Sequence, residues 1–241
     1  MQPDVLCMQE TKLADDAFPA LTFAGMGYET AHHGQGQWNG VAIASRVGLD
    51  EVSIGFDGQP GFGKDGAAPE AEARALGATC NGVRVWSLYV PNGRSLDDPH
   101  LEYKLEWLAA LRDTASGWLA QDPEQPIALV GDWNIVPRDD DVWDISAFVG
   151  KTHVSPPERA AFEAFNDAGF ADVVRPFTPG PGVYTYWDYT QLAFQKRRGM
   201  RIDFILGSPD LAARVTGAEI VKDERRPKKG ATAPSDHAPV L

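Results

Sequence analysis

Asp132 and Asn134 are the residues of this 241-residue chain whose types and spacing point most directly to chemistry. They belong to the segment Gly131-Asp132-Trp133-Asn134, which follows the apolar run 127–130 and so ends a predicted buried strand. Carboxylate and amide oxygens at a strand end can bind a divalent cation or a phosphate. Because acidic turns after strands are common, this segment alone is also consistent with a purely structural turn.

Other short apolar segments of the chain also end in polar groups. The residues at these ends are Glu10, Tyr89, Asn92, Asp236 and His237. Magnesium prefers carboxylate oxygens and keeps several waters, so one or two protein carboxylates and a substrate phosphate can complete its shell. Glu10 and Asp236 are the predicted anchors of such a site.

Composition indicates a single α/β domain spanning residues 1–241, since 43% of the residues are hydrophobic and the chain can bury a large core. Cys7 and Cys80 lie in apolar runs, which favours free thiols in a reducing compartment. No apolar run approaches the roughly 20 residues of a membrane helix, and the amino terminus lacks a secretion-signal pattern. A cytoplasmic monomer without membrane contact is expected.

The net charge of −12 argues against nucleic-acid binding, because phosphate recognition relies on Lys and Arg. Basic residues nevertheless gather in two loop-like stretches, which predict either solvated loops or a phosphate-facing rim. These stretches contain Lys196, Arg197, Arg198 and Arg201, and Arg225, Arg226, Lys228 and Lys229.

The predicted elements include strands that pair antiparallel. Residues 73–80 and 83–90 flank Asn81-Gly82, a strong hairpin signal, which excludes a simple Rossmann fold. A helix is predicted over 99–118, capped by Asp97 or Asp98, and another from Pro156 through Phe165, started by a capping box of Ser155 and Glu158. Further strands are predicted at 41–44, 184–187, 202–206 and 215–221, with a loop over 55–69.

The ordered motifs resemble the exonuclease III family of the endonuclease/exonuclease/phosphatase superfamily from end to end. The segments that carry the resemblance are 6–12 (LCMQETK), 38–43 (WNGVAI), 89–93 (YVPNG), 131–134 (GDWN), 184–189 (YTYWDY), 199–203 (GMRID) and 235–240 (SDHAPV). The resemblance implies a DNase I-like, four-layered αββα sandwich, in which helices flank two mixed sheets and strand ends converge on the site.

The resemblance also implies roles for the polar residues. Glu10 and Asp236 would hold Mg²⁺, for which Mn²⁺ is a possible substitute, and Asp132, Asn134 and His237 are further candidates for metal contact. Asp132 would position or deprotonate the attacking water. Tyr89, Asn92 and His237 would contact the phosphate, with His237 oriented by Asp203. Asn134 would hold either the phosphate or the Asp132 carboxylate. Individually, Asp203, Tyr89 and His237 are equally consistent with a turn residue, a sheet aromatic and a core histidine.

The family hydrolyses the DNA backbone 5′ of abasic sites and removes nucleotides or blocking groups from 3′ ends. Double-stranded DNA with such lesions is therefore the expected partner, bound with the help of Asn92, Arg94 and Arg201. Tyr186 and Trp187 are candidate walls of a pocket for a baseless sugar, although Trp187 also fits a core aromatic.

One departure from the family pattern concerns the amino terminus, where the family's first strand, with its metal-binding Asn, and first helix are absent before Gln9. The last strand also stops early, at Leu241. An incomplete metal site and exposed strand edges are expected, with doubtful activity in this form. Two alternatives stay open: hydrolysis of an inositol or lipid phosphate, which the acidic charge favours, and a non-catalytic DNA-binding remnant.

Overall fold

Two stacked β-sheets form the centre of the molecule in the computed structural model, which describes residues 2–64, 67–226 and 233–241. The smaller sheet has the order β1-β3-β2, and both of its pairings are antiparallel. Its strands are β1 (Val5–Gln9), β2 (Glu29–His33) and β3 (Val41–Ser45). β3 is the central strand, and each of its residues is buried, as expected for the continuous apolar run at 41–44.

The larger sheet has the order β4-β5-β6-β7-β9-β8 and mixes both kinds of pairing. Its strands are β4 (Asp50–Ile54), β5 (Ala75–Cys80), β6 (Val83–Tyr89), β7 (Ile127–Asp132), β8 (Ala171–Asp172) and β9 (Asp203–Gly207). β5 and β6 form the predicted antiparallel hairpin, in which Asn81 and Gly82 both adopt positive φ angles. β6 and β7 are parallel, so the chain must cross over between them.

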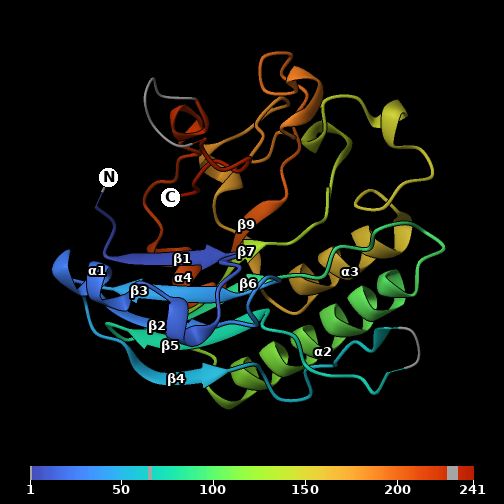
Figure 1. Cartoon of the computed structure of the whole chain (residues 1–241). Coiled ribbons are helices and arrows are strands. Elements are labelled where there is room, and N and C mark those ends of the chain that lie inside the picture. The colour runs from blue at the N-terminus through green and yellow to red at the C-terminus, as the bar shows by residue number, and fades with distance from the viewer. Residues whose placement is uncertain (1, 65–66, 227–232) are drawn as a thin grey trace.

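The crossover is the long helix α2 (Pro99–Gln121), which packs with α3 (Pro156–Asp167) against the outer face of the larger sheet (Figure 1). Asp98 caps α2 by accepting a hydrogen bond from the backbone N–H of His100. Shorter helical segments are α1 (Ala20–Gly25), α4 (Pro209–Arg214), η1 (Asp15–Ala17), η3 (Asp139–Asp141), η4 (Ile145–Phe148), η5 (Arg175–Phe177), η6 (Thr190–Leu192) and η7 (Lys222–Arg225). No helix among the described residues has the length and apolar character of a membrane-spanning segment.

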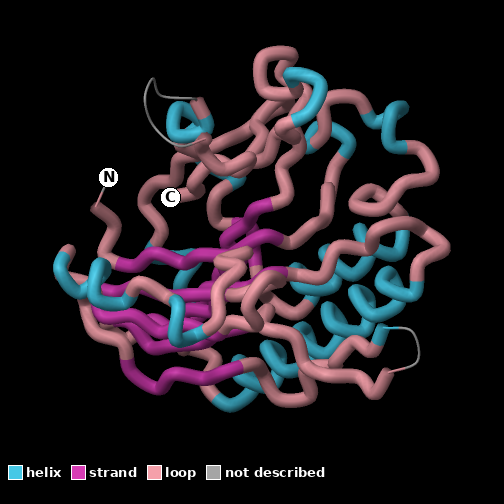
Figure 2. Tube along the Cα trace, in the orientation of Figure 1, coloured by secondary structure: helices cyan, strands magenta, loops and turns pink. Residues whose placement is uncertain are grey.

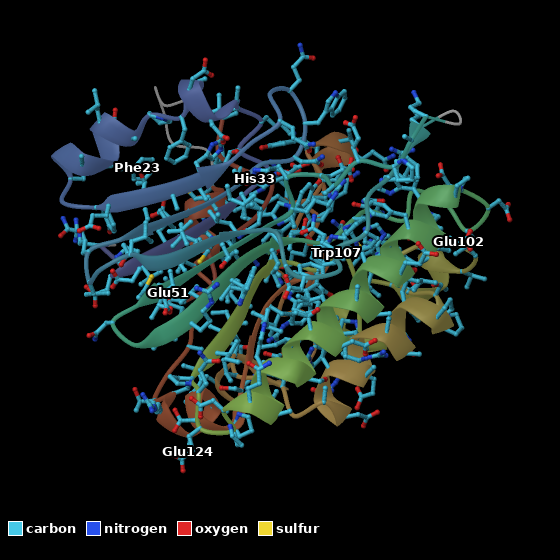
Figure 3. All side chains as sticks on the ribbon, turned by 90° about the horizontal axis from the view of Figure 1, so that it is seen from below. Phe23, His33, Glu51, Glu102, Trp107 and Glu124 are labelled. Atoms are coloured by element: carbon cyan, nitrogen blue, oxygen red, sulfur yellow. The ribbon has the colours of Figure 1, made fainter. Side chains whose placement is uncertain are left out.

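Two apolar clusters hold these layers together. One lies between the larger sheet and the helices and contains Trp107, which sits in the middle of the molecule in Figure 3 while Glu51, Glu102 and Glu124 lie at its periphery. The other lies between the sheets and includes Ile43 of β3 and Leu76 of β5. Cys7 and Cys80 are free thiols, as expected. The α/β class with two sheets and flanking helices is thus confirmed.

The loop-rich upper part of the molecule differs from the prediction (Figure 2). Residues 184–187 were expected to form a strand but make only isolated bridges, from Tyr186 to Met200 and to His237. Residues 215–221 are likewise not a strand, and Ile220 makes a single bridge to Val240. Both segments have strand composition, but in the described part of the chain they pair only through these single bridges.

The predicted capping box of α3 is also wrong in its details. The helix begins at Pro156 as expected, but the Ser155 side chain accepts no backbone hydrogen bond. Its hydroxyl instead donates to Oε2 of Glu158 at 2.6 Å. Glu158 is fully buried and is drawn into a hydrogen-bonded ion pair with Lys104, so its carboxylate serves tertiary packing as well as the helix terminus.

Candidate active site

Three polar residues are brought into one row by the register of the larger sheet. Tyr89 of β6 lies opposite Asp132 of β7, and Asp132 lies opposite Asp203 of β9. Because side chains of directly paired residues point to the same face of a sheet, the phenol and both carboxylates share one surface. In Figure 1 the ends of β1, β6, β7 and β9 come together at this edge.

Gly131 allows this close approach. Its φ is +149°, and a Cβ built on it would lie 1.9 Å from the backbone oxygen of Leu88 on the neighbouring strand. Only glycine avoids that clash. The glycine of the Gly-Asp-Trp-Asn segment is thus required for β7 to pair with β6 and to present Asp132.

Asn134 is 4% exposed and is fixed by hydrogen bonds on both ends of its amide. Its Nδ2 donates to the Val90 carbonyl at 3.0 Å and to Oδ2 of Asp132 at 3.3 Å. Its Oδ1 accepts a hydrogen bond from Nδ2 of Asn92 at 3.2 Å and lies 3.1 Å from Nε2 of His153. The backbone N–H of Asn134 also donates to Asp132, so these two residues form one rigid unit.

His237 meets Asp203 as predicted, with 2.9 Å between Nδ1 and Oδ2. Burial lowers the pKa of His237, but the Asp203 carboxylate outweighs burial and raises the pKa to about 10. The Tyr186 ring lies beside the imidazole, with 5.0 Å between the ring centroids. The protonated ring is therefore oriented by Asp203, and its Nε2–H is available to donate to an anion.

Asp132 stands in an unfavourable environment for a carboxylate. Burial, followed by the Asp203 carboxylate, raises the pKa of Asp132 to about 7, although His237 and the Asn134 N–H oppose this shift. A carboxyl group whose pKa lies near neutrality is suited to accept a proton during a reaction. Closely spaced carboxylates with a raised pKa are typical of a functional site rather than of a structural turn.

Glu10 follows β1 and joins the row through Tyr89, whose hydroxyl donates to Oε1 of Glu10 at 2.5 Å. Its Oε2 lies 3.4 Å from Nζ of Lys12. The Arg74 guanidinium covers the Tyr89 ring at 4.9 Å. Burial and the carboxylates of Asp132 and Glu10 raise the pKa of Tyr89, so its hydroxyl remains a donor.

The acidic side chains of the site are of the type that binds a divalent cation. Among the residues that the structure describes, no three His, Cys, Asp or Glu side chains are arranged around a common metal position. A Mg²⁺ site built from one or two carboxylates, water and substrate oxygens needs no such arrangement. Burial, followed by the neighbouring Asp203 carboxylate, raises the pKa of Asp132, and the carboxylates gathered here carry negative charge that a hard cation would relieve. The donor set therefore fits Mg²⁺ or Mn²⁺.

Comparison with known proteins gives this site its context. The sequence matches the Endonuclease/Exonuclease/phosphatase family over residues 1–237. The chain belongs to this family. It is 32% identical to exodeoxyribonuclease III of Haemophilus influenzae, in an alignment that covers 99% of this chain and 89% of that protein.

Solved structures of this family are also similar to the chain. The 3′ phosphatase NExo from Neisseria, bound to a product DNA hairpin, is 36% identical with a TM-score of 0.89, covering 99% of this chain and 87% of that one. An AP endonuclease from Archaeoglobus fulgidus is 33% identical with a TM-score of 0.87 and the same coverage. The chain is thus an exonuclease III-like DNA phosphodiesterase of the DNA repair nucleases, in a family that is generally metal-dependent.

Two expected substrate contacts of this family member are corrected by the structure. Arg201 is 1% exposed, and its Nη2 lies 3.1 Å from Oδ2 of Asp172, so its guanidinium is committed to the protein interior. Trp187 is fully buried, edge-on to Tyr184 and Phe194. Both residues support the surrounding loops. Tyr186 is partly exposed next to His237, in keeping with a position in a pocket wall.

Fewer residues of the predicted basic rim are exposed than expected. Lys196, Arg197 and Arg198 are exposed, but Arg225 is 5% exposed and its Nη2 donates to the Trp187 carbonyl. Lys228 and Lys229 lie outside the described residues. Arg94 is exposed beside Asn92, whose Oδ1 accepts a hydrogen bond from the Arg94 N–H.

Sequence reasoning missed His153 and Lys104, and it assigned Glu158 only to a capping box. His153 has a φ of +73° and lies beside Asn134; nothing in the sequence around it indicates this position. Lys104 is fully buried, forms a short ion pair with Glu158, and donates to the Asn134 carbonyl at 2.6 Å. A signal for it existed, because Lys104 stands on the apolar stripe of α2, between Leu101 and Leu108, where a charge needs a buried partner.

Proposed function

We propose that this nuclease hydrolyses phosphate esters in double-stranded DNA, 5′ of abasic sites and at 3′ ends that carry nucleotides or blocking groups, with Mg²⁺ as its cofactor. The observation that supports the proposal best is the row of Tyr89, Asp132 and Asp203, closed by His237. This row combines a carboxylate with a pKa near 7 and a protonated imidazole on one surface.

In the proposed mechanism Asp132 accepts a proton from the attacking water, while its neighbour Asn134 keeps the carboxylate in place. His237, held by Asp203, donates from Nε2 to a phosphate oxygen. The His237 donor is in place before the reaction, so it can stabilise negative charge as that charge develops on the phosphate. Because burial surrounds both groups with protein rather than water, their effect on the transition state is strengthened.

Glu10 and Asp236 are the residues that would hold the cation. When bound, Mg²⁺ would supply charge neutralisation at the phosphate. Tyr89 orients Glu10 through its hydroxyl, and Asn92 reaches the same surface from the loop after β6. The similar proteins include a 3′ phosphatase and an AP endonuclease, which supports both classes of DNA substrate.

The test uses two labelled duplexes, one with a single abasic-site analogue and one with a 3′-phosphate, each incubated with the purified chain and Mg²⁺. We expect cleavage of at least one duplex and a loss of about 10³-fold with Asp132→Ala, within the usual range for a general base. Asp113→Ala is the matched control, because Asp113 is an exposed aspartate on α2. Full activity of Asp132→Ala would refute the mechanism, and turnover of inositol phosphate alone would refute the substrate.

A further inference from the structure

The turn that carries Glu10 has an unusual backbone. Glu10 and Lys12 both have a φ of +52°, in the left-handed region that residues with a side chain seldom adopt. This conformation is unfavourable for a residue with a Cβ and persists only where the surroundings hold it in place. Something in this part of the fold must therefore stabilise the turn.

Thr11, between the two strained residues, is the anchor of the turn. Its backbone N–H donates to the Gly40 carbonyl at 3.2 Å, and the Lys12 N–H donates to the Asn39 carbonyl at 3.0 Å. Its side-chain Oγ1 lies 2.8 Å from Nε2 of His32 on β2. The turn is thus tied to the loop before β3 through its backbone and to β2 through one hydroxyl.

An acidic group lies on the far side of His32. Nδ1 of His32 lies 2.8 Å from Oδ1 of Asp15, at the start of η1. The geometry at Nδ1 does not satisfy a hydrogen bond, so the Asp15 carboxylate acts on the ring through its charge at close range. The Thr11 hydroxyl and Nε2 of His32 share one hydrogen bond, so that Asp15, His32 and Thr11 lie in a row of contacts behind the turn.

The surroundings leave this row of contacts little room to rearrange. The His32 side chain is 5% exposed, and the Phe18 ring stacks on it with 4.4 Å between the ring centroids. A Cβ on Gly34 would lie 2.5 Å from Cε1 of His32, and one on Gly40 would lie 2.1 Å from the Thr11 hydroxyl. The imidazole and the hydroxyl are therefore enclosed by backbone that approaches as closely as glycine permits.

We propose that His32 is a positioning residue, which acts through Thr11 to keep the strained turn in the conformation that presents Glu10 to the active site. The inference rests on the proposed function, in which Glu10 binds the cation. It assigns a task to Asp15, His32 and Thr11, which touch neither the phosphate nor the reacting water in the proposed mechanism.

Thr11→Val tests the link, because it replaces the hydroxyl with a methyl group of the same shape, and Thr11→Ser restores the hydroxyl. Thr114→Val is the matched control, because Thr114 lies on α2, away from the site, and its hydroxyl donates to the carbonyl of Asp57 in the loop after β4. The first measurement is amide hydrogen exchange by NMR. We expect exchange of the Thr11 and Lys12 amides to accelerate about three- to tenfold in Thr11→Val alone, which corresponds to one lost hydrogen bond.

The amide of Ile43 on β3 distinguishes local loosening from general destabilisation. Equal acceleration at Ile43 and at Thr11, or no change at Thr11, would overturn the positioning role. The second measurement is Mn²⁺ binding, followed by the EPR signal of the free ion, together with kcat and KM on the abasic duplex. We expect Thr11→Val to weaken Mn²⁺ binding about three- to tenfold and to lower kcat more than it changes KM, with Thr11→Ser close to the parent chain.

Failure of the positioning role and failure of the proposed function give different results. If the parent chain neither binds Mn²⁺ nor cleaves DNA while exchange at Thr11 still responds to Thr11→Val, the turn is anchored as described and the proposed function is wrong. If the parent chain cleaves DNA and Thr11→Val cleaves it equally well, the proposed function stands and the positioning role is wrong.

Discussion

Two clusters of buried charge lie on either side of Asn134, and they are built in opposite ways. The cluster of Lys104 and Glu158 is balanced, because the Glu158 carboxylate accepts hydrogen bonds from the ammonium, from two hydroxyls and from a backbone N–H. Burial would raise the pKa of Glu158, yet Lys104 and these donors lower it. The cluster of Asp132 and Asp203 instead places two carboxylates side by side, with His237 as their compensating cation.

The difference in charge balance distinguishes a structural cluster from a functional one. A balanced buried pair is expensive to break and does no chemistry, since neither group can readily exchange a proton. An unbalanced cluster costs stability and has a carboxyl group whose pKa lies close to neutrality, which is the property that a general base needs. Asn134 belongs to both clusters, as its carbonyl accepts from Lys104 while its amide donates to Asp132. The balanced cluster thus supports the reactive one.

Asp132→Asn should give the largest difference between an effect on DNA cleavage and an effect on stability. We expect DNA cleavage to fall about 10³-fold or more, while the free energy of unfolding at neutral pH stays the same or rises, because one of two adjacent carboxylates is removed. Cleavage assays and urea unfolding measure the two effects. A large loss of stability in this variant would place Asp132 in the structural class and contradict the comparison.

The pH dependence of the same variant has a defined sign. Since the pKa of Asp132 is raised to about 7 in the folded chain, its contribution to stability is complete below the unfolded pKa of about 4 and is lost as pH rises to about 7. Unfolding at a series of pH values should therefore show the gain from Asp132→Asn growing between these limits. His237 loses a neighbouring charge in the variant, which reduces the gain without changing its sign.

Glu158→Gln should have the reverse signature, with a large loss of stability. Removing the carboxylate leaves the Lys104 ammonium buried without its counter-charge, a change that costs about 3–5 kcal/mol. Urea unfolding gives the value. Adding Lys104→Met to this variant should recover part of the loss, because the unpaired charge is then gone. If Lys104→Met lowered the free energy of unfolding further when added to Glu158→Gln, the two side chains would not be coupled.

The fold was more accessible from the sequence than the buried networks were. The hairpin around Asn81-Gly82 and the helix over 99–118 have strong local signals, and both were predicted correctly. The structure brings Asp132, Asn134, Asp203 and His237 together, an arrangement implied only by family resemblance. Short-range pattern carries no information on such long-range contacts.

The errors have the same physical origin. Arg201 was expected to contact DNA from the family resemblance, and its basic neighbours in the sequence agreed with this, but it pairs with Asp172 in the interior. Residues 184–187 have strand composition and yet bridge only singly to Met200 and His237. In both cases a partner distant in sequence decides the outcome, and the loop-rich part of the molecule depends on such partners more than the sheets do.

Tyr89→Phe should have an intermediate effect on the reactive cluster alone. The ring remains under the Arg74 guanidinium, so stability should change little, but the hydrogen bond to Glu10 is lost. A hydrogen bond to a charged group contributes about 1.5 kcal/mol, which corresponds to about a tenfold fall in kcat/KM. Steady-state kinetics with thermal unfolding tests this. Unchanged kinetics would remove Tyr89 from the site and leave it a sheet aromatic.

Arg226→Ala is the smallest change and sets the baseline for both clusters. Arg226 pairs with Asp223 at 2.7 Å, and their side chains are 64% and 81% exposed. Water screens such a pair, so we expect the free energy of unfolding to change by less than about 1 kcal/mol and cleavage to stay at the parental level. Urea unfolding and the duplex assay measure both. A loss of cleavage without a loss of stability would show that the exposed basic residues of this loop bind DNA, so that charge at the surface, and not only in the buried row, serves the reaction.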